Sequence, residues 1–149
     1  MTNYCFTGSR KINYGQGAKV EAKLRQMTGT SWHVGDASGV DTVVRHYLES
    51  ANLPVKLYKA EGKQAWQLAQ RSKEMVDGCV ALGGAKLIAF PDKPCPAGVK
   101  PGKTFAGKGS GTWGTIAYAK NLGLEIEIIW LTPGLTEPDW MKRYQLSLF

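Results

Sequence analysis

Residues 32–51 read WHVGDASGVDTVVRHYLESA, which joins a short apolar strand to a helix through a glycine-rich turn. In the helical part, apolar side chains recur at three- and four-residue spacing and build one face: Val40, Val43, Val44, Tyr47 and Leu48. This spacing predicts an amphipathic helix over 40–51. A strand that runs directly into a helix is the repeating unit of α/β proteins, so the stretch indicates a parallel sheet with helical crossovers.

The same alternation extends in both directions along the chain. Apolar, β-rich runs occur at 4–7, 55–58, 87–90 and 126–131, and helical patterns occur at 17–27, 64–82 and 112–121. We therefore predict an α/β fold, a Rossmann-like three-layer sandwich around a mainly parallel sheet of about five strands. In such sheets, ligands bind at the carboxyl ends of the strands, near the point where the strand order reverses.

The composition fits one domain. The chain has 149 residues, of which 43% are hydrophobic, and no break in composition marks a second unit. We expect a Rossmann-like domain over residues 1–131 and a C-terminal tail over 132–149.

No targeting pattern opens the chain and no apolar run approaches the roughly 18 residues of a membrane span, which predicts a cytoplasmic protein without membrane contact. The three cysteines lack metal-site spacing, so no metal is expected, and we expect no resident cofactor either.

The formal net charge of +7 is unevenly distributed. Residues 1–29 carry +4 and residues 91–110 carry +3, whereas the other segments nearly balance. The second excess falls in PDKPCPAGVKPGKTFAGKGSG, residues 91–111, which contains Lys93, Lys100, Lys103 and Lys108. A glycine-rich cationic loop is typical of a solvated surface, but also of a phosphate-binding lid.

The first predicted strand ends in TGSR, residues 7–10. Small residues such as Gly8 and Ser9 let the backbone approach a phosphate closely, and Arg10 adds a guanidinium that can bind it with two parallel hydrogen bonds. The tetrapeptide therefore predicts an anion-binding strand end.

The second predicted strand ends in VGDASGVD, residues 34–41. Gly35 and Gly39 permit an unusual backbone turn, and Ser38 is placed to cap the following helix. Asp36 and Asp41 suit a ribose or base hydroxyl, or a structural bond across the turn. A plain strand-to-helix turn with a capping serine explains the segment equally well.

The fourth predicted strand leads through the basic loop to GKGSGTWGT, residues 107–115. Here Gly109, Ser110, Gly111 and Thr112 open a helix, and the unbonded N–H groups of a helix start attract an anion. The segment lacks the Lys-Ser or Lys-Thr pair of a Walker loop, and the first strand lacks the GxGxxG pattern of an NAD site.

Together these motifs resemble those of the SLOG superfamily, which joins DNA-processing protein A with the LONELY GUY cytokinin enzymes. TGSR is similar to the family's first-strand GxR, and VGDASGVDTVVRHYLE to its glycine-rich turn followed by Gly-hydrophobic-Asp. RSKEM, residues 71–75, resembles R-N-x-x-M with Ser72 in place of Asn, and GSGTWGTIAYAKNLG resembles the GxGT segment. The resemblance covers residues 4–130 and is nearest to small stand-alone bacterial members of unassigned function.

The resemblance implies that a nucleotide, a nucleotide-derived ligand or nucleic acid binds in the cleft that the motifs form. It assigns the floor of this cleft, one wall and the phosphate site to the following residues: Gly8, Ser9 and Arg10; Gly35, Ser38, Gly39 and Asp41; and Gly109, Gly111 and Thr112. It also implies that Arg71 reaches in from the third helix, whereas a helix-face arginine is the plainer interpretation.

LONELY GUY enzymes cleave the base from a nucleoside 5′-monophosphate, and the resemblance implies that a Glu three residues after the Gly-Thr pair takes part. This chain has Thr115 there, and a hydroxyl cannot replace that carboxylate. We therefore expect a binding protein, sensor or carrier for a nucleotide derivative or another phosphate-bearing small ligand rather than a phosphoribohydrolase. Some proteins of LONELY GUY-like fold carry the pterin molybdenum cofactor, whose phosphate suits the same cleft.

Single-stranded DNA binding is the remaining alternative, which the resemblance to DNA-processing protein A allows. The net charge favours it, as do Trp66 and Trp113, which fall near the expected cleft. Trp32 and Trp130 fall in predicted strands and are expected in the core, and Trp66 on an apolar helix face is more typical of packing.

The tail carries apolar side chains that must be covered by its own domain or by a neighbouring molecule. These residues are Trp140, Met141, Tyr144, Leu146, Leu148 and Phe149. Members of the SLOG superfamily commonly form homodimers, so the resemblance implies a homodimer or higher homo-oligomer.

Overall fold

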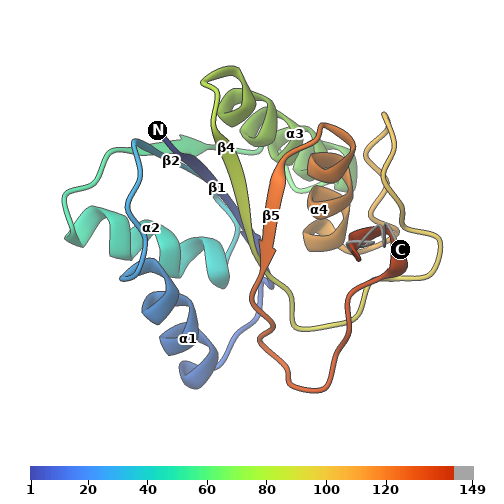
Figure 1. The fold of residues 1–149 in the computed structure, drawn as a ribbon, viewed down its shortest axis with the longest axis horizontal. Helices are drawn as coiled ribbons and strands as arrows, with labels where there is room; N and C mark the ends of the chain where they lie inside the picture. Colours follow the sequence, from blue (N-terminus) through green and yellow to red (C-terminus); the bar gives the residue numbers. More distant parts are fainter. Residues whose placement is uncertain (143–149) are drawn as a thin grey trace, which may run out of the picture.

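Strands and helices alternate along the chain, as the sequence predicts. The computed structural model describes residues 1–142, in which a five-stranded sheet is flanked by helices on both faces (Figure 1). The strands are β1 (Asn3–Gly8), β2 (Ser31–Gly35), β3 (Val55–Tyr58), β4 (Ala85–Phe90) and β5 (Glu125–Ile128). The helices are α1 (Tyr14–Leu24), α2 (Val40–Ser50), α3 (Ala65–Ala81) and α4 (Gly111–Asn121), and a 3₁₀ turn follows at Asp139–Met141.

The sheet is parallel throughout, with the strand order β3-β2-β1-β4-β5. From β1 the chain winds outward through β2 to β3, and it then returns to the other side of β1 to form β4 and β5. The order therefore reverses between β1 and β4, which opens a crevice at the carboxyl ends of these two strands. The predicted Rossmann-like sandwich is confirmed.

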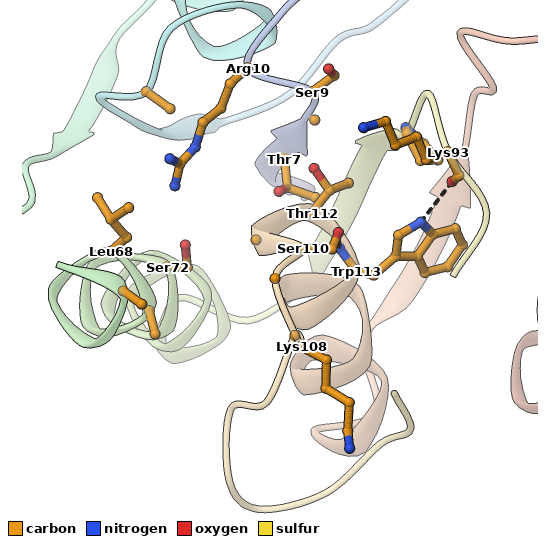
Figure 2. Close-up of a pocket in the computed structure, with 18 of the residues that line it drawn as sticks. Thr7, Ser9, Arg10, Leu68, Ser72, Lys93, Lys108, Ser110, Thr112 and Trp113 are labelled. Carbon is orange, nitrogen blue, oxygen red and sulfur yellow. Dashed lines mark hydrogen bonds between the residues drawn. The ribbon is translucent and has the colours of Figure 1, made fainter. Parts of the chain in front are cut away.

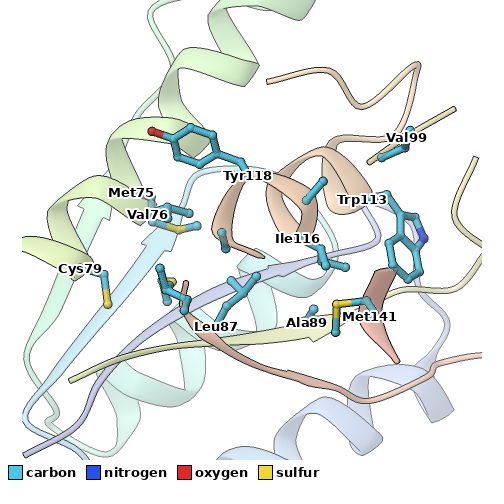
Figure 3. Close-up of a cluster of buried hydrophobic side chains, with 14 residues drawn as sticks. Met75, Val76, Cys79, Leu87, Ala89, Val99, Trp113, Ile116, Tyr118 and Met141 are labelled. Carbon is cyan, nitrogen blue, oxygen red and sulfur yellow. The ribbon is translucent and has the colours of Figure 1, made fainter. Parts of the chain in front are cut away.

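Each face of the sheet has its own core. On one face α1 and α2 cover Phe6, and on the other α3 and α4 cover Cys5, because successive side chains of a strand point to opposite faces. The predicted apolar face of α2 is confirmed, since Val40, Val44 and Leu48 are fully buried. Figure 3 shows the second core, in which α3 and α4 pack over β1 and β4.

Several element boundaries differ from the predicted ones by one to three residues, and the start of α1 and the end of β5 are two examples. Helix α1 begins at Tyr14 rather than at residue 17, because Asn13 and Gln16 form a reciprocal capping box with N···O distances of 2.8 and 2.9 Å. Strand β5 ends at Ile128 rather than at 131. The backbone beyond it still bonds the chain after β4, since the Leu131 N–H donates to the Pro91 carbonyl at 2.9 Å.

The twenty residues between β4 and α4 have no helix or strand, but two tryptophans form hydrogen bonds to their backbone. The indole N–H of Trp113 donates to the Lys93 carbonyl at 2.9 Å, and that of Trp140 donates to the Val99 carbonyl at 3.0 Å. The two rings meet edge to face at 6.1 Å, and Met141 is buried beside them. The start of the tail thus packs on its own domain, whereas the predicted apolar residues Tyr144, Leu146, Leu148 and Phe149 lie outside the described residues.

Candidate functional site

A cleft of about 880 Å³ lies at the carboxyl ends of β1 and β4. Its walls are the chain after β1, the first half of α3, the β4–α4 loop and the first turn of α4. Nine of the site residues that we predicted line this cleft: Gly8, Ser9, Arg10, Asp41, Arg71, Gly109, Ser110, Gly111 and Thr112. Segments distant in the sequence therefore meet where the strand order reverses.

The chain after β1 projects Arg10 into the cleft. Gly8 leaves no room for a side chain, because a Cβ there would lie 2.6 Å from Val40. The Ser9 carbonyl accepts a hydrogen bond from the Val40 N–H at 2.9 Å, and the Ser9 hydroxyl donates to the Lys11 carbonyl at 2.9 Å. With this turn fixed, the Arg10 side chain extends between α3 and the start of α4 (Figure 2).

The start of α4 presents open amides to the same space. Ser110 caps the helix, its hydroxyl accepting from the Trp113 N–H at 3.1 Å, and Gly109 turns the chain with φ +92°. Within residues 1–142, no hydrogen bond engages the N–H groups of Gly111 and Thr112. A Cβ at Gly111 would lie 3.9 Å from Nη2 of Arg10, so the guanidinium stands directly over the helix start.

Two further hydroxyls in the cleft were not assigned a role from the sequence. Thr7 and Ser72 are each only 8% exposed, both line the cleft, and neither side chain has a hydrogen-bond partner among the described residues. In Figure 2 they flank Arg10 from β1 and α3. Both residues could have been found in the sequence, since Thr7 is the first residue of TGSR and Ser72 is the residue that differs from R-N-x-x-M.

The turn after β2 lines the cleft only through Ala37, and its predicted site residues support the cleft from behind: Gly35, Asp36, Ser38 and Gly39. The prediction that Ser38 caps α2 is wrong, because Gly39 is the N-cap. The Ser38 hydroxyl instead donates to the Arg10 carbonyl at 3.0 Å. Gly39 has φ +73°, and a Cβ there would lie 2.3 Å from the Ser9 carbonyl oxygen. Gly35 has no unusual backbone angle. A larger residue there would be crowded, because an added Cβ would lie 2.9 Å from Asp41 and 3.1 Å from Arg71.

Asp36 and Arg71 form an ion pair at 2.9 Å. The other Asp36 oxygen accepts from the Ala60 N–H at 3.2 Å, so this carboxylate bonds α3 and the chain after β3 rather than a group across its own turn. Arg71 does reach the cleft from α3, as the resemblance implied, but it is nearly buried and one of its terminal nitrogens is occupied by Asp36.

Asp41 is the buried carboxylate of the cleft wall. It is 7% exposed, and one oxygen accepts from the Ala37 N–H at 3.2 Å. Burial raises the pKa of Asp41 from 3.8 to about 6, although Arg71, the Ala37 N–H and Arg45 each oppose the shift. A carboxyl group with such a pKa is sensitive to small changes in its surroundings near neutral pH.

Positive charge dominates the lining. Six basic side chains and two acidic ones face the cleft: Arg10, Lys11, Lys63, Arg71, Lys93 and Lys108, against Asp41 and Asp92. The basic loop therefore contributes only two of its four lysines, since Lys100 and Lys103 do not line it. Lys108 extends away from Arg10, with its Nζ 3.2 Å from a Cβ position on Gly98 (Figure 2).

The expected packing of Trp66 on an apolar helix face is wrong, because this side chain is 63% exposed on the cleft. Trp113 lines the cleft as predicted, although it is only 1% exposed and also packs in the core. Burial in α3 begins only at Arg71, so the apolar pattern in its first turns faces the cleft instead of the sheet. Trp32 is buried as predicted, and Trp130 lies just after β5, partly buried against the core.

Thr115 cannot act on a ligand in this arrangement. Its side chain is fully buried, and its hydroxyl donates to the Gly111 carbonyl one turn earlier at 2.8 Å. The position at which the LONELY GUY pattern has Glu therefore presents no acid or base to the cleft.

No protein-family model, no curated protein and no solved structure matches this chain. Within residues 1–142, no group of three or more His, Cys, Asp or Glu side chains could hold a metal ion. No helix in the described part of the chain is long and apolar enough to cross a membrane.

Proposed function

We propose that the protein binds a small ligand through a phosphate group, as a sensor or carrier of a nucleotide derivative or of a phosphate-bearing cofactor such as a pterin. The observation that carries this proposal is a convergence of unused donors on one part of the cleft. These donors are the Arg10 guanidinium, the N–H groups of Gly111 and Thr112, and the hydroxyls of Thr7 and Ser72. Charge-assisted bonds to such donors are the strong interactions of phosphate sites.

The test is calorimetric titration with AMP and with ribose 5-phosphate. Arg10→Ala should weaken binding of both compounds by about 10- to 150-fold, because it removes charged hydrogen bonds to the phosphate. Lys100→Ala is the matched control, since it removes an equal charge from an exposed side chain outside the cleft. Equal losses in the two variants would show that net charge, not a phosphate site, governs binding.

Single-stranded nucleic acid is the second candidate, favoured by the exposed Trp66 among basic side chains. A labelled oligothymidine should then bind with an affinity that falls steeply between about 50 and about 200 mM salt, because phosphate contacts release counterions. Binding of mononucleotides alone, without the oligonucleotide, would leave only the small-ligand proposal.

The proposal predicts binding without turnover. Incubation with nucleoside 5′-monophosphates should release no free base, because Thr115 is buried and bonded within α4. Release of base, detected by chromatography, would instead show a phosphoribohydrolase that uses a carboxylate such as Asp41.

Self-association as a homodimer remains a prediction of the SLOG resemblance. Size-exclusion chromatography with light scattering on the full chain tests it, and a mass of about 16.3 kDa at all concentrations would contradict it.

A further inference from the structure

Trp66 is the one tryptophan of this chain that is mostly exposed. The chain has five tryptophans, all within the described residues, and the other four are buried or partly buried. Trp66 stands in the first turn of α3 and lines the cleft with Leu68 and Ala69. A large apolar ring that faces a cleft rather than a core typically marks a surface that contacts something else.

The indole ring of Trp66 is held in place. Its N–H donates to the side-chain oxygen of Gln64 at 2.7 Å, and Gln64 is the N-cap residue of α3. The Gln64 N–H in turn donates to the side-chain oxygen of Gln67 at 3.1 Å. A ring fixed by its own hydrogen bond loses little conformational freedom when a second ring stacks on it.

Trp66 and the phosphate donors occupy different ends of one cleft. Ser72 lies beside Arg10 at the donor end (Figure 2), and Trp66 precedes Ser72 by six residues, which is about 9 Å along a helix. Side chains of a helix lean toward its N-terminus, so the ring of Trp66 points further from the donor end. Leu68 and Ala69 line the apolar wall between the two ends.

We propose that the ligand carries a planar aromatic group joined to its phosphate by a short linker, and that Trp66 stacks on this group. The inference rests on the proposed function for the phosphate end. Because the indole N–H is already bonded to Gln64, Trp66 offers the ligand only its π face. Recognition of the aromatic group by Trp66 therefore depends on ring size more than on hydrogen-bonding edges, and larger rings bind more tightly.

The experiment compares phosphates with and without a ring. AMP, CMP, riboflavin 5′-phosphate and ribose 5-phosphate are titrated calorimetrically into the wild-type protein and into Trp66→Ala. In the wild type, the tightest aromatic phosphate should bind about 5- to 150-fold more tightly than ribose 5-phosphate, which is the usual range for one stacked ring. Trp66→Ala should abolish this preference and leave the affinity for ribose 5-phosphate unchanged.

Two controls separate stacking from a loss of structure. Trp66→Phe retains a π face and should keep most of the preference. Leu82→Ala removes another exposed apolar side chain, 55% exposed at the far end of α3 and outside the cleft, and should have no effect on binding.

The failures of the two proposals are distinguishable. If Arg10→Ala weakens binding of ribose 5-phosphate but Trp66→Ala leaves the aromatic preference intact, the phosphate site stands and the stacking inference is overturned. The same holds if the wild type shows no preference for aromatic phosphates. If none of the four compounds binds the wild-type protein, both proposals are wrong.

Discussion

Gly111→Asp should separate the stability of the fold from ligand binding. Gly111 is the first residue of α4, it has no positive φ, and the nearest atom to an added Cβ is Nη2 of Arg10 at 3.9 Å. A carboxylate at this point faces the positive end of the helix dipole and the exposed guanidinium. Each contact is worth at most about 1 kcal/mol.

The variant should therefore be more stable by about 0.5–1.5 kcal/mol, which raises the Tm of a chain of this size by about 1–6 °C. Its affinity for AMP should fall by at least about 100-fold, because the carboxylate takes the place of the phosphate and repels it. Thermal denaturation and calorimetry on the same sample measure both effects. The matched variant Gly111→Asn adds a similar volume without charge and should lose much less affinity.

A folded, stabilised Gly111→Asp protein that binds AMP as tightly as the wild type would contradict a phosphate site at the start of α4. The phosphate would then bind elsewhere. A variant that loses stability as well as affinity would contradict the assigned geometry, since the structure leaves room for the side chain.

Three other predictions concern the scaffold of the site. Asp41→Asn should raise the free energy of unfolding by up to about 3 kcal/mol at pH 7.5 but not at about pH 4. Burial raises the pKa of Asp41 from 3.8 to about 6, so the folded state binds the proton more tightly than the unfolded state does. The stability of the wild type therefore falls as the pH rises from about 4 through about 6. Equal urea denaturation curves for the wild type and Asp41→Asn at pH 7.5 would contradict this prediction. Gly39→Ala should lower the free energy of unfolding by about 2 kcal/mol or more, and Gly83→Ala by about 1 kcal/mol. Both glycines have positive φ, but only at Gly39 would the added Cβ clash with backbone atoms. Equal losses of Tm in the two variants would contradict this clash. Trp140→Phe keeps a ring but removes the bond to the Val99 carbonyl, and should cost about 1 kcal/mol and speed hydrogen exchange in the β4–α4 loop; unchanged exchange would mean that the tail does not hold this loop.

The fold was predictable because its signals are local. The three-four spacing of Val40, Val44 and Leu48 sets which side of α2 is buried, and short apolar strands between such helices leave few topologies. The start of α1 was predicted three residues too late, although its signal is also local, since Asn13 and Gln16 form a capping box. The spacing of apolar residues does not determine where a strand ends, and β5 ends at Ile128 although the apolar run continues to residue 131.

The site was predictable where one segment supplies both the turn and the donors. TGSR and GKGSGT each do this, and both line the cleft. Ser38 was assigned a local role as a cap, whereas the structure gives its hydroxyl to the Arg10 carbonyl, a partner 28 residues away in sequence. A single sequence does not reveal such a partner, and the same is true of the ion pair between Asp36 and Arg71.

The tryptophans show how periodicity can mislead. Trp66 shares a helical pattern with apolar neighbours and was expected to pack, but α3 begins to bury side chains only five residues later. Trp113 follows a glycine-rich loop and lines the cleft as expected, but its ring is almost fully buried, because the β4–α4 loop and the tail cover this side of α4. The helix period identifies an apolar face but not what covers it.

An NMR titration of the ¹⁵N-labelled protein with ribose 5-phosphate tests the phosphate site most directly. This compound has no aromatic ring, so it engages the donor end alone. We expect saturable shifts that are largest at the amides of Gly111 and Thr112, whose N–H groups are unbonded in residues 1–142, and we expect these shifts to be lost in Arg10→Ala. Saturable binding with the largest shifts elsewhere, or no binding at all, would contradict this expectation.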